Sequence, residues 1–155
     1  MTTYHVSAQA SPNPGVQTAV LPPAPMWTFV ASDTGKPIVY EVGTSLNVGG
    51  GTSPVMVLGR PAALGVSPRD IVPAVCEEPD APAALSYMAL DWVASPSPPV
   101  QVFRRQSIKQ TTPAQGVLWS FPRGLAIPQG GQLGLFNAQA GSSGNILDAW
   151  VAFDE

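Results

Sequence analysis

Charged side chains are scarce in this chain. Of its 155 residues, 7 are basic and 10 are acidic, so charged residues make up 11% of the sequence, against roughly 25% in a typical globular domain. The net charge of −3 and the scattered basic residues argue against a nucleic-acid-binding surface, which needs clustered Lys and Arg. A weakly charged surface repels copies of itself poorly. We therefore expect a protein whose surface is covered by neighbours.

Cysteine and histidine occur once each. Cys76 has no partner for an internal disulfide or a cysteine-based metal site, and His5 is the single imidazole that could activate a nucleophile. The chain has no Gly-x-Ser-x-Gly segment and no Gly-Lys-Ser/Thr after a glycine-rich loop. We therefore expect no catalytic residues, no metal and no cofactor, and we expect that the protein is not an enzyme.

Long apolar runs are also missing. No run approaches the roughly 18 residues that a membrane span requires. The first 15 residues, MTTYHVSAQASPNPG, lack the charged and apolar regions of a signal peptide. We expect a protein that is made in a host cytoplasm and has no membrane partner.

Proline and glycine are abundant instead. The 18 Pro and 15 Gly are spaced so that no stretch of ten residues favours a helix. Residues 1–26 are polar and Pro-rich and end in VLPPAPM, which predicts an extended N-terminal arm. From Trp27 onward, short β-branched and aromatic runs alternate with turn residues. This pattern predicts one all-β domain over residues 27–155, a jelly roll or β-sandwich of about eight strands.

The candidate strands differ in clarity. In the last of them, Leu147, Ala149, Val151 and Phe153 share one apolar face, and Trp150 lies on the other face, which suggests an interface or a ligand site. The full set is WTFVA, KPIVYEV, PVMVLG, ALSYMALDWVA, VQVFRRQSI, GVLWSFP, GLAIP, QLGLFN and NILDAWVAFD.

Two connecting segments carry specific expectations. Residues 70–85 contain three prolines, which predicts a long loop with at most one helical turn. In GLAIPQGGQL, Pro128 would end one strand and Gly130 and Gly131 are free to take positive φ, which predicts a hairpin-like bend.

The triplet Asp33-Thr34-Gly35 matches the catalytic triplet of dimeric aspartic proteases, in which two carboxylates share a proton. Lys36 and Pro37 follow it, where that family has a small residue and then an acid. The triplet is more simply a turn between two strands. The strand carboxylates Glu41, Asp91 and Asp148 are scattered, which is typical of solvated faces.

The C-terminal half runs as strand, IPQGG bend, strand, GSSG loop and a last strand ending in WVAFDE, behind a Pro-rich arm. In this pattern the chain resembles the small jelly-roll decoration (cement) proteins of tailed-bacteriophage capsids and, more loosely, the trimeric tumour-necrosis-factor-like fold. The resemblance implies a non-enzymatic structural protein of the virion that forms homotrimers on the capsid surface. There it would stabilise the shell by bridging subunits of the major capsid protein.

The resemblance also directs attention to interface residues. The predicted contacts are Tyr4, His5, Pro22, Pro23, Trp27, Arg104, Arg105 and Trp150. The alternative is a carbohydrate- or receptor-binding β-sandwich, such as a phage fibre or tail tip. In that case Trp150 would lie in the binding site, because an indole ring stacks well on the apolar face of a sugar.

Overall fold

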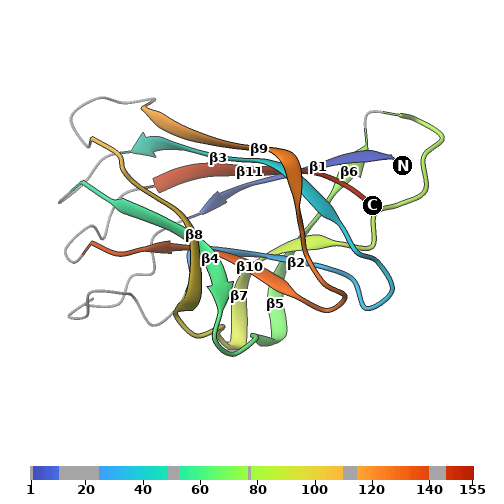
Figure 1. Ribbon diagram of the computed structural model, residues 1–155, viewed down its shortest axis with the longest axis horizontal. Helices are drawn as coiled ribbons and strands as arrows, with labels where there is room; N and C mark the ends of the chain where they lie inside the picture. Colours follow the sequence, from blue (N-terminus) through green and yellow to red (C-terminus); the bar gives the residue numbers. More distant parts are fainter. Residues whose placement is uncertain (1, 11–24, 49–52, 77, 110–114, 140–145) are drawn as a thin grey trace.

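The computed structural model describes residues 2–10, 25–48, 53–76, 78–109, 115–139 and 146–155. In these residues there are eleven strands and no helix. The strands form two antiparallel sheets, sheet A of 5 strands and sheet B of 6 strands, and the sheets lie one above the other (Figure 1). The predicted all-β sandwich is therefore confirmed. None of the described segments contains a helix able to cross a membrane.

Both sheets draw strands from the whole length of the chain. In spatial order, sheet A contains β6 (Val75–Cys76), β1 (Thr3–Ala10), β11 (Ile146–Asp154), β3 (Ile38–Val48) and β9 (Gly116–Ala126). Sheet B contains β5 (Val66–Pro73), β7 (Tyr87–Ala94), β2 (Trp27–Val30), β10 (Gln132–Asn137), β4 (Val55–Pro61) and β8 (Pro99–Ser107).

The strand pairing has a mirror order along the chain. β1 pairs with β11, β2 with β10, β3 with β9 and β4 with β8, all antiparallel. Successive strands of each half alternate between the two sheets. This is the strand order of a jelly roll, in which one long antiparallel ribbon is wrapped around a core. The three remaining strands, β5, β6 and β7, come from a segment inserted between β4 and β8.

The core lies between the sheets and is built by alternation of inward and outward side chains. On β11, Leu147, Val151 and Phe153 are fully buried, and the intervening residues face outward. Phe153 joins the two sheets directly. Its ring stacks on Tyr4 of sheet A at a centroid distance of 5.6 Å and meets the ring of Phe29 of sheet B edge-on at 4.8 Å.

The expected N-terminal arm is wrong for residues 3–10. Thr3–Ala10 form β1, which pairs with β11 over its whole length and with β6 on its other side. Tyr4 and Val6 point into the core and are 3% and 1% exposed. Tyr4 and Val6 therefore alternate with Thr3, His5 and Ser7, which are exposed or half-buried, as in any strand with one solvated face. Residues 11–24, which hold four of the five prolines of the expected arm, lie outside the described residues.

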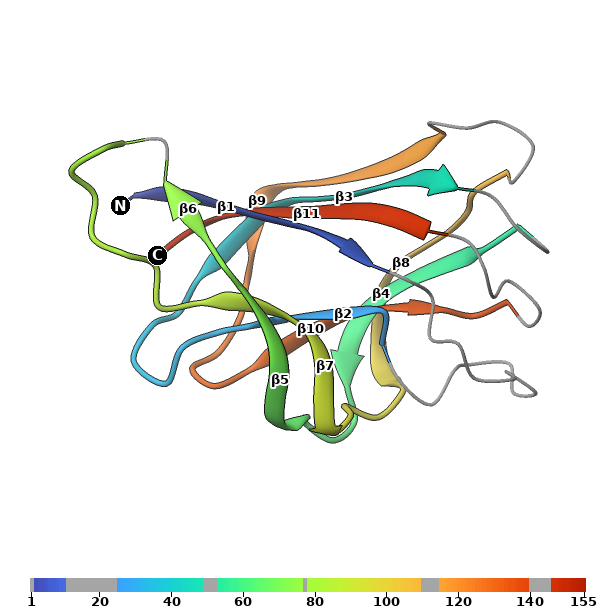
Figure 2. The same ribbon diagram turned by 180° about the vertical axis from the view of Figure 1, so that it is seen from behind.

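The expected loop over residues 70–85 is wrong for its first part, whereas residues 78–85 form neither strand nor helix, as expected. Its first part belongs to β5, and Val75–Cys76 form β6. β5 contains two prolines, Pro68 and Pro73, and it tolerates them because it is the edge strand of sheet B, where one row of N–H groups has no strand to bond. β6 then adds to the edge of sheet A beside β1. The inserted segment thus reaches from one sheet to the other (Figure 2).

The expected hairpin at GLAIPQGGQL is wrong as well. GVLWSFP and GLAIP belong to one strand, β9, in sheet A, and the following β10 belongs to sheet B. The bend therefore crosses between sheets. It lies beside the β2–β3 turn, which crosses in the opposite direction: the Gly130 N–H donates to the Ser32 carbonyl at 3.0 Å and the Ala31 N–H to the Gly131 carbonyl at 3.0 Å. Of the two glycines, only Gly130 has positive φ, +62°.

Burial of β1 generates a stability prediction. Val6→Ala removes two methyl groups from a closed core and should lower the free energy of unfolding by about 2 kcal/mol. Ser7→Ala, its exposed neighbour, should change the free energy by less than about 0.5 kcal/mol. Urea unfolding of both variants measures the difference. Equal stability of the two variants would mean that residues 3–10 are an arm after all.

Candidate functional site

Two segments at one end of the molecule contain no charged residues. Residues 61–68 and 92–103 contain no Asp, Glu, Lys, Arg or His. They comprise the adjoining ends of β4, β5, β7 and β8 with the loops that join them, which lie together at the bottom of Figures 1 and 2. The two loops are bonded to each other, because the Ala62 N–H donates to the Pro98 carbonyl at 3.2 Å. We call these two segments the uncharged tip.

Aliphatic side chains project from the tip into solvent. Val100 is 78% exposed, Val66 and Val93 are each 60% exposed, and Leu64 and Val102 are 52% and 51% exposed. A single exposed valine is ordinary, but five exposed aliphatic side chains in segments without charged residues favour a surface that meets another molecule. One cation reaches the tip from its edge: the Arg60 guanidinium donates to Gln101 Oε1 at 3.4 Å and lies 5.2 Å from the centroid of the Phe103 ring.

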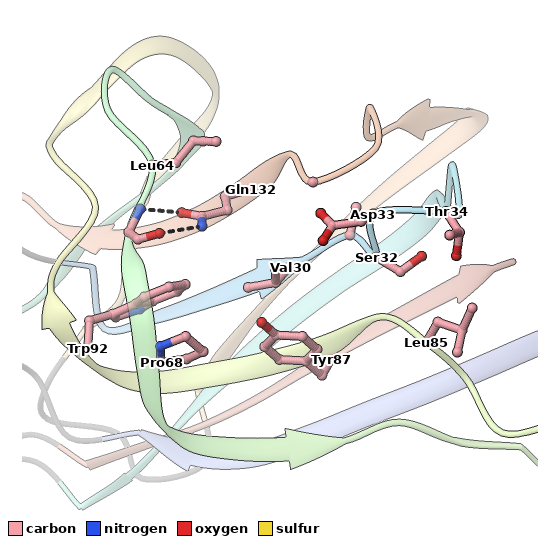
Figure 3. Close-up of a pocket in the computed structure, with 13 residues that line it drawn as sticks. Val30, Ser32, Asp33, Thr34, Leu64, Pro68, Leu85, Tyr87, Trp92 and Gln132 are labelled. Carbon is pink, nitrogen blue, oxygen red and sulfur yellow. Dashed lines mark hydrogen bonds between the residues drawn. The ribbon is translucent and has the colours of Figure 1, made fainter.

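A pocket of about 460 Å³ borders the tip. Tip residues Leu64, Pro68 and Trp92 line one side of it, and the β2–β3 turn with Asp33 lines the opposite side. Tyr87 of β7 lies between the two sides, and its hydroxyl and the Asp33 carboxylate face the same space (Figure 3). We call this cavity the Asp33 pocket.

Asp33 is the only charged side chain that lines the pocket. Within the described residues its carboxylate has no hydrogen bond or ion pair. Burial raises the pKa of the Tyr87 phenol, and the negative charge of Asp33 raises that pKa further. The predicted turn at Asp33-Thr34-Gly35 is confirmed, since the triplet lies between β2 and β3, with the Gly35 N–H bonded to Ser32 Oγ at 2.7 Å.

Glu155 holds the walls of the pocket in place. Its carboxylate accepts hydrogen bonds from the N–H groups of Leu85 and Ser86 at 2.8 and 3.1 Å and from the Ser86 hydroxyl at 2.8 Å. The Ser32 hydroxyl donates to it at 3.2 Å. Burial alone would raise the pKa of Glu155, but these hydrogen bonds outweigh burial and hold the pKa below its ordinary value.

A second surface centres on Trp150, on the outer face of sheet A. Its indole lies flat over Gly43, where an added Cβ would overlap the ring carbons. The indole Nε1–H donates to Glu41 Oε1 at 2.9 Å, which fixes the ring. A hollow of about 260 Å³, lined also by Ser7 and Asp148, lies beside the ring. Leu118 of β9 lies opposite Gly43 on the outer face of sheet A and is 55% exposed. We call this surface the Trp150 face.

The predicted interface residues are divided by the structure. Tyr4 and Trp27 are 3% and 0% exposed, so their side chains belong to the core and are unavailable to a partner. Half-buried His5 shares the outer face of sheet A with half-buried Trp150. Pro22 and Pro23 lie outside the described residues.

Arg104 and Arg105 are exposed on β8 in sheet B, and the Arg104 guanidinium lies 4.9 Å from the ring centroid of Phe121. They are therefore on the other sheet from Trp150 and do not form one site with it. Among the described residues, no three His, Cys, Asp or Glu side chains are close enough to hold a metal ion.

Sequence reasoning missed the uncharged tip and the pocket. A signal for the tip was present, because two charge-free stretches of eight and twelve residues flank the inserted segment, residues 61–68 and 92–103. No local signal pairs Asp33 with Tyr87, since they lie on different elements 54 residues apart in the chain. Asp33 itself stood out only for its resemblance to a protease triplet.

The Glu155 bonds predict a pH dependence. A folded-state pKa below the unfolded value of about 4.3 gives stability that is present above that pH and is lost as the pH falls through the folded pKa. Glu155→Gln should therefore be less stable than the parent at pH 7, and the difference should shrink toward pH 3. Asp80→Asn, at an exposed position, is the control. Thermal unfolding across pH would contradict this if the Glu155→Gln difference stayed constant.

No protein-family model matches the chain, and searches of the curated proteins and of the solved structures return no match. The function must therefore be argued from the three surfaces of the chain itself: the uncharged tip, the Asp33 pocket and the Trp150 face.

Proposed function

We propose that the protein is a non-enzymatic structural protein of a tailed-bacteriophage virion, which decorates the capsid as a homotrimer and bridges major capsid protein subunits. The observation that carries this proposal is the uncharged tip, with its five aliphatic side chains at least half exposed. The jelly-roll strand order and the low charge of the whole chain support it.

The energetics of the tip suit a repeated contact. Fully burying one valine or leucine contributes about 1.5–3 kcal/mol, so a few such side chains offset only part of the cost of association. A single tip would therefore bind weakly. A trimer carries three tips, and the second and third contacts form at a high effective concentration on a regular lattice. Modest apolar contacts of this kind suit a protein that covers a symmetric shell.

The contact surface of this proposal differs from the one expected from the sequence. The backbone of residues 3–10 is paired in sheet A, and the side chains of Tyr4 and Val6 are buried in the core. The body of the jelly roll, through its tip, is therefore the proposed capsid-facing element.

The tip predicts the effect of a single charge. Val100→Asp should reduce binding to the capsid at least about tenfold, because the new carboxylate must be desolvated in the contact. Its folding should be unchanged, since Val100 is 78% exposed. Ser120→Asp, which places the same charge on the exposed outer face of sheet A, is the matched control.

The measurement is cosedimentation with shells assembled from the major capsid protein of the phage that the proposal requires. Parent and Ser120→Asp should sediment with the shells, and Val100→Asp should stay in the supernatant. A parent protein that does not bind the shells contradicts the proposed function. Equal binding of Val100→Asp and Ser120→Asp contradicts the assignment of the contact to the tip.

A second candidate function, carbohydrate or receptor binding, is favoured by the Trp150 face. The indole is held flat by Gly43 and by the bond to Glu41, so its outer side offers a rigid aromatic surface. Carbon-bound hydrogens of a sugar stack on the electron-rich face of such a ring. The adjacent hollow, with Ser7 and Asp148, provides polar groups for the sugar hydroxyls.

A glycan array tests this candidate. The parent should bind at least one glycan, Trp150→Phe should keep part of the affinity, and Trp150→Ala should lose at least about tenfold, or about 1.4 kcal/mol. Failure of the parent to bind any glycan, or undiminished binding by Trp150→Ala, rules out this use of the Trp150 face.

A further inference from the structure

We propose that the Asp33 pocket receives a cationic side chain, arginine or lysine, from the protein that the tip contacts. This inference deepens the proposed function. It rests on that function in one respect, namely that the tip contacts another protein. The pocket opens beside the tip, because Leu64, Pro68 and Trp92 belong both to the tip and to the pocket lining. A partner that covers the tip would therefore also reach the pocket.

The charge of the pocket selects the ligand. Asp33 is the one charged group in the lining, and within the described residues no cation of the chain is paired with it. The Asp33 carboxylate and the Tyr87 hydroxyl face the same space (Figure 3), and burial together with the Asp33 charge raises the pKa of the Tyr87 phenol on the neighbouring strand β7. A cationic group can form an ion pair with the Asp33 carboxylate and at the same time pack against the face of the Tyr87 ring.

The apolar walls select the stem of the ligand. Val30, Leu64 and Leu85 line the cavity together with Pro68 and the two rings. An aliphatic chain of three or four methylenes could pack along these walls while its charged end reaches Asp33. The volume of about 460 Å³ lies in the range of sites that enclose small ligands or large side chains.

The polar groups of the pocket favour a cation over a sugar. The Gln132 amide is turned toward Gly65, since it accepts from the Gly65 N–H at 2.8 Å and donates to the Gly65 carbonyl at 3.1 Å, which uses one of its two N–H donors (Figure 3). The Ser32 hydroxyl accepts from the Gly35 N–H and donates to Glu155. A sugar needs several free partners, whereas a guanidinium needs one accessible carboxylate.

The probe is the peptide Ac-Gly-Arg-Gly-NH2, and the control ligand is the same peptide with citrulline, the uncharged isostere of arginine. Titration of the isotope-labelled protein, followed by NMR to about 20 mM peptide, measures both dissociation constants. The arginine peptide should shift the amide signals of residues 31–34 and 85–92. The citrulline peptide should bind at least about tenfold more weakly.

Variants then assign the effect to the pocket. Asp33→Asn should weaken binding of the arginine peptide about tenfold, and Tyr87→Ala should also weaken it, whereas Tyr87→Phe keeps the ring and should bind nearly as the parent does. Asp91→Asn is the control, because Asp91 is an exposed carboxylate on β7, the strand that carries Tyr87, and does not line the pocket. Asp33 is exposed, so its change leaves the core intact. Tyr87 is half-buried and packs against Val30, Ala89 and Trp92, so thermal unfolding must show that Tyr87→Ala is folded, whereas Tyr87→Phe keeps this packing.

Three results would overturn the inference: equal binding of the two peptides, an Asp33→Asn variant that binds as the parent does, or no shift of the pocket signals at the highest concentration. The titration contains no capsid, so its failure is distinct from failure of the proposed function. Shells that bind the parent but not Val100→Asp, together with a pocket that ignores arginine, would leave the tip contact standing and remove this proposal.

Discussion

The contact of Phe153 with both sheets is the interaction on which the rest of the structure depends. Its ring touches Tyr4 from sheet A and Phe29 from sheet B, so it fixes the spacing and relative position of the two layers. Because side chains alternate along a strand, Glu155, two residues on, lies on the same side as Phe153. There it bonds the β2–β3 turn through Ser32 and the segment before β7 through Leu85 and Ser86. The position of Glu155, and with it the bonds that hold the walls of the Asp33 pocket, therefore follows from the packing of Phe153 in the core.

The same jelly roll separates three surfaces that differ in chemistry. The uncharged tip is aliphatic, the Asp33 pocket combines one carboxylate with rings and apolar walls, and the Trp150 face presents a fixed indole beside acidic and hydroxyl groups. The first two are adjacent, and the third lies on the outer face of the other sheet. A partner seated on the tip could therefore use the pocket while the Trp150 face stayed open to a different ligand.

Local pattern predicted much of the fold because each strand carries its own alternation. The buried side of β11 and the outward position of Trp150 both follow from residues 147–154 alone. Pairing could not be predicted, since a turn between strands of one sheet and a turn between sheets use the same residues, as the bend at Gly130 shows. β1 was missed although Tyr4 and Val6 alternate with polar residues, because the prolines that follow it suggested an arm.

The candidate site was less predictable than the fold for a physical reason. Asp33 and Tyr87 meet only because β2 and β7 are neighbours in sheet B, and the insertion that contains β7 has prolines that argued against strands. The properties of single residues therefore directed attention to Trp150 as an interface or ligand-site residue, but not to the pocket. The two stretches without charged residues are visible in the sequence. Only the structure shows that they lie side by side and form the tip.

The central claim is that the uncharged tip is the surface through which the protein contacts its partner. Hydrogen–deuterium exchange of the protein, free and bound to capsid shells, tests this most directly, because it maps the covered backbone without any substitution. The account predicts slower exchange on binding within residues 61–68 and 92–103, and unchanged exchange in the exposed outer row around Trp150. Protection confined to β1 and β11, with the tip exchanging as in the free protein, would contradict it.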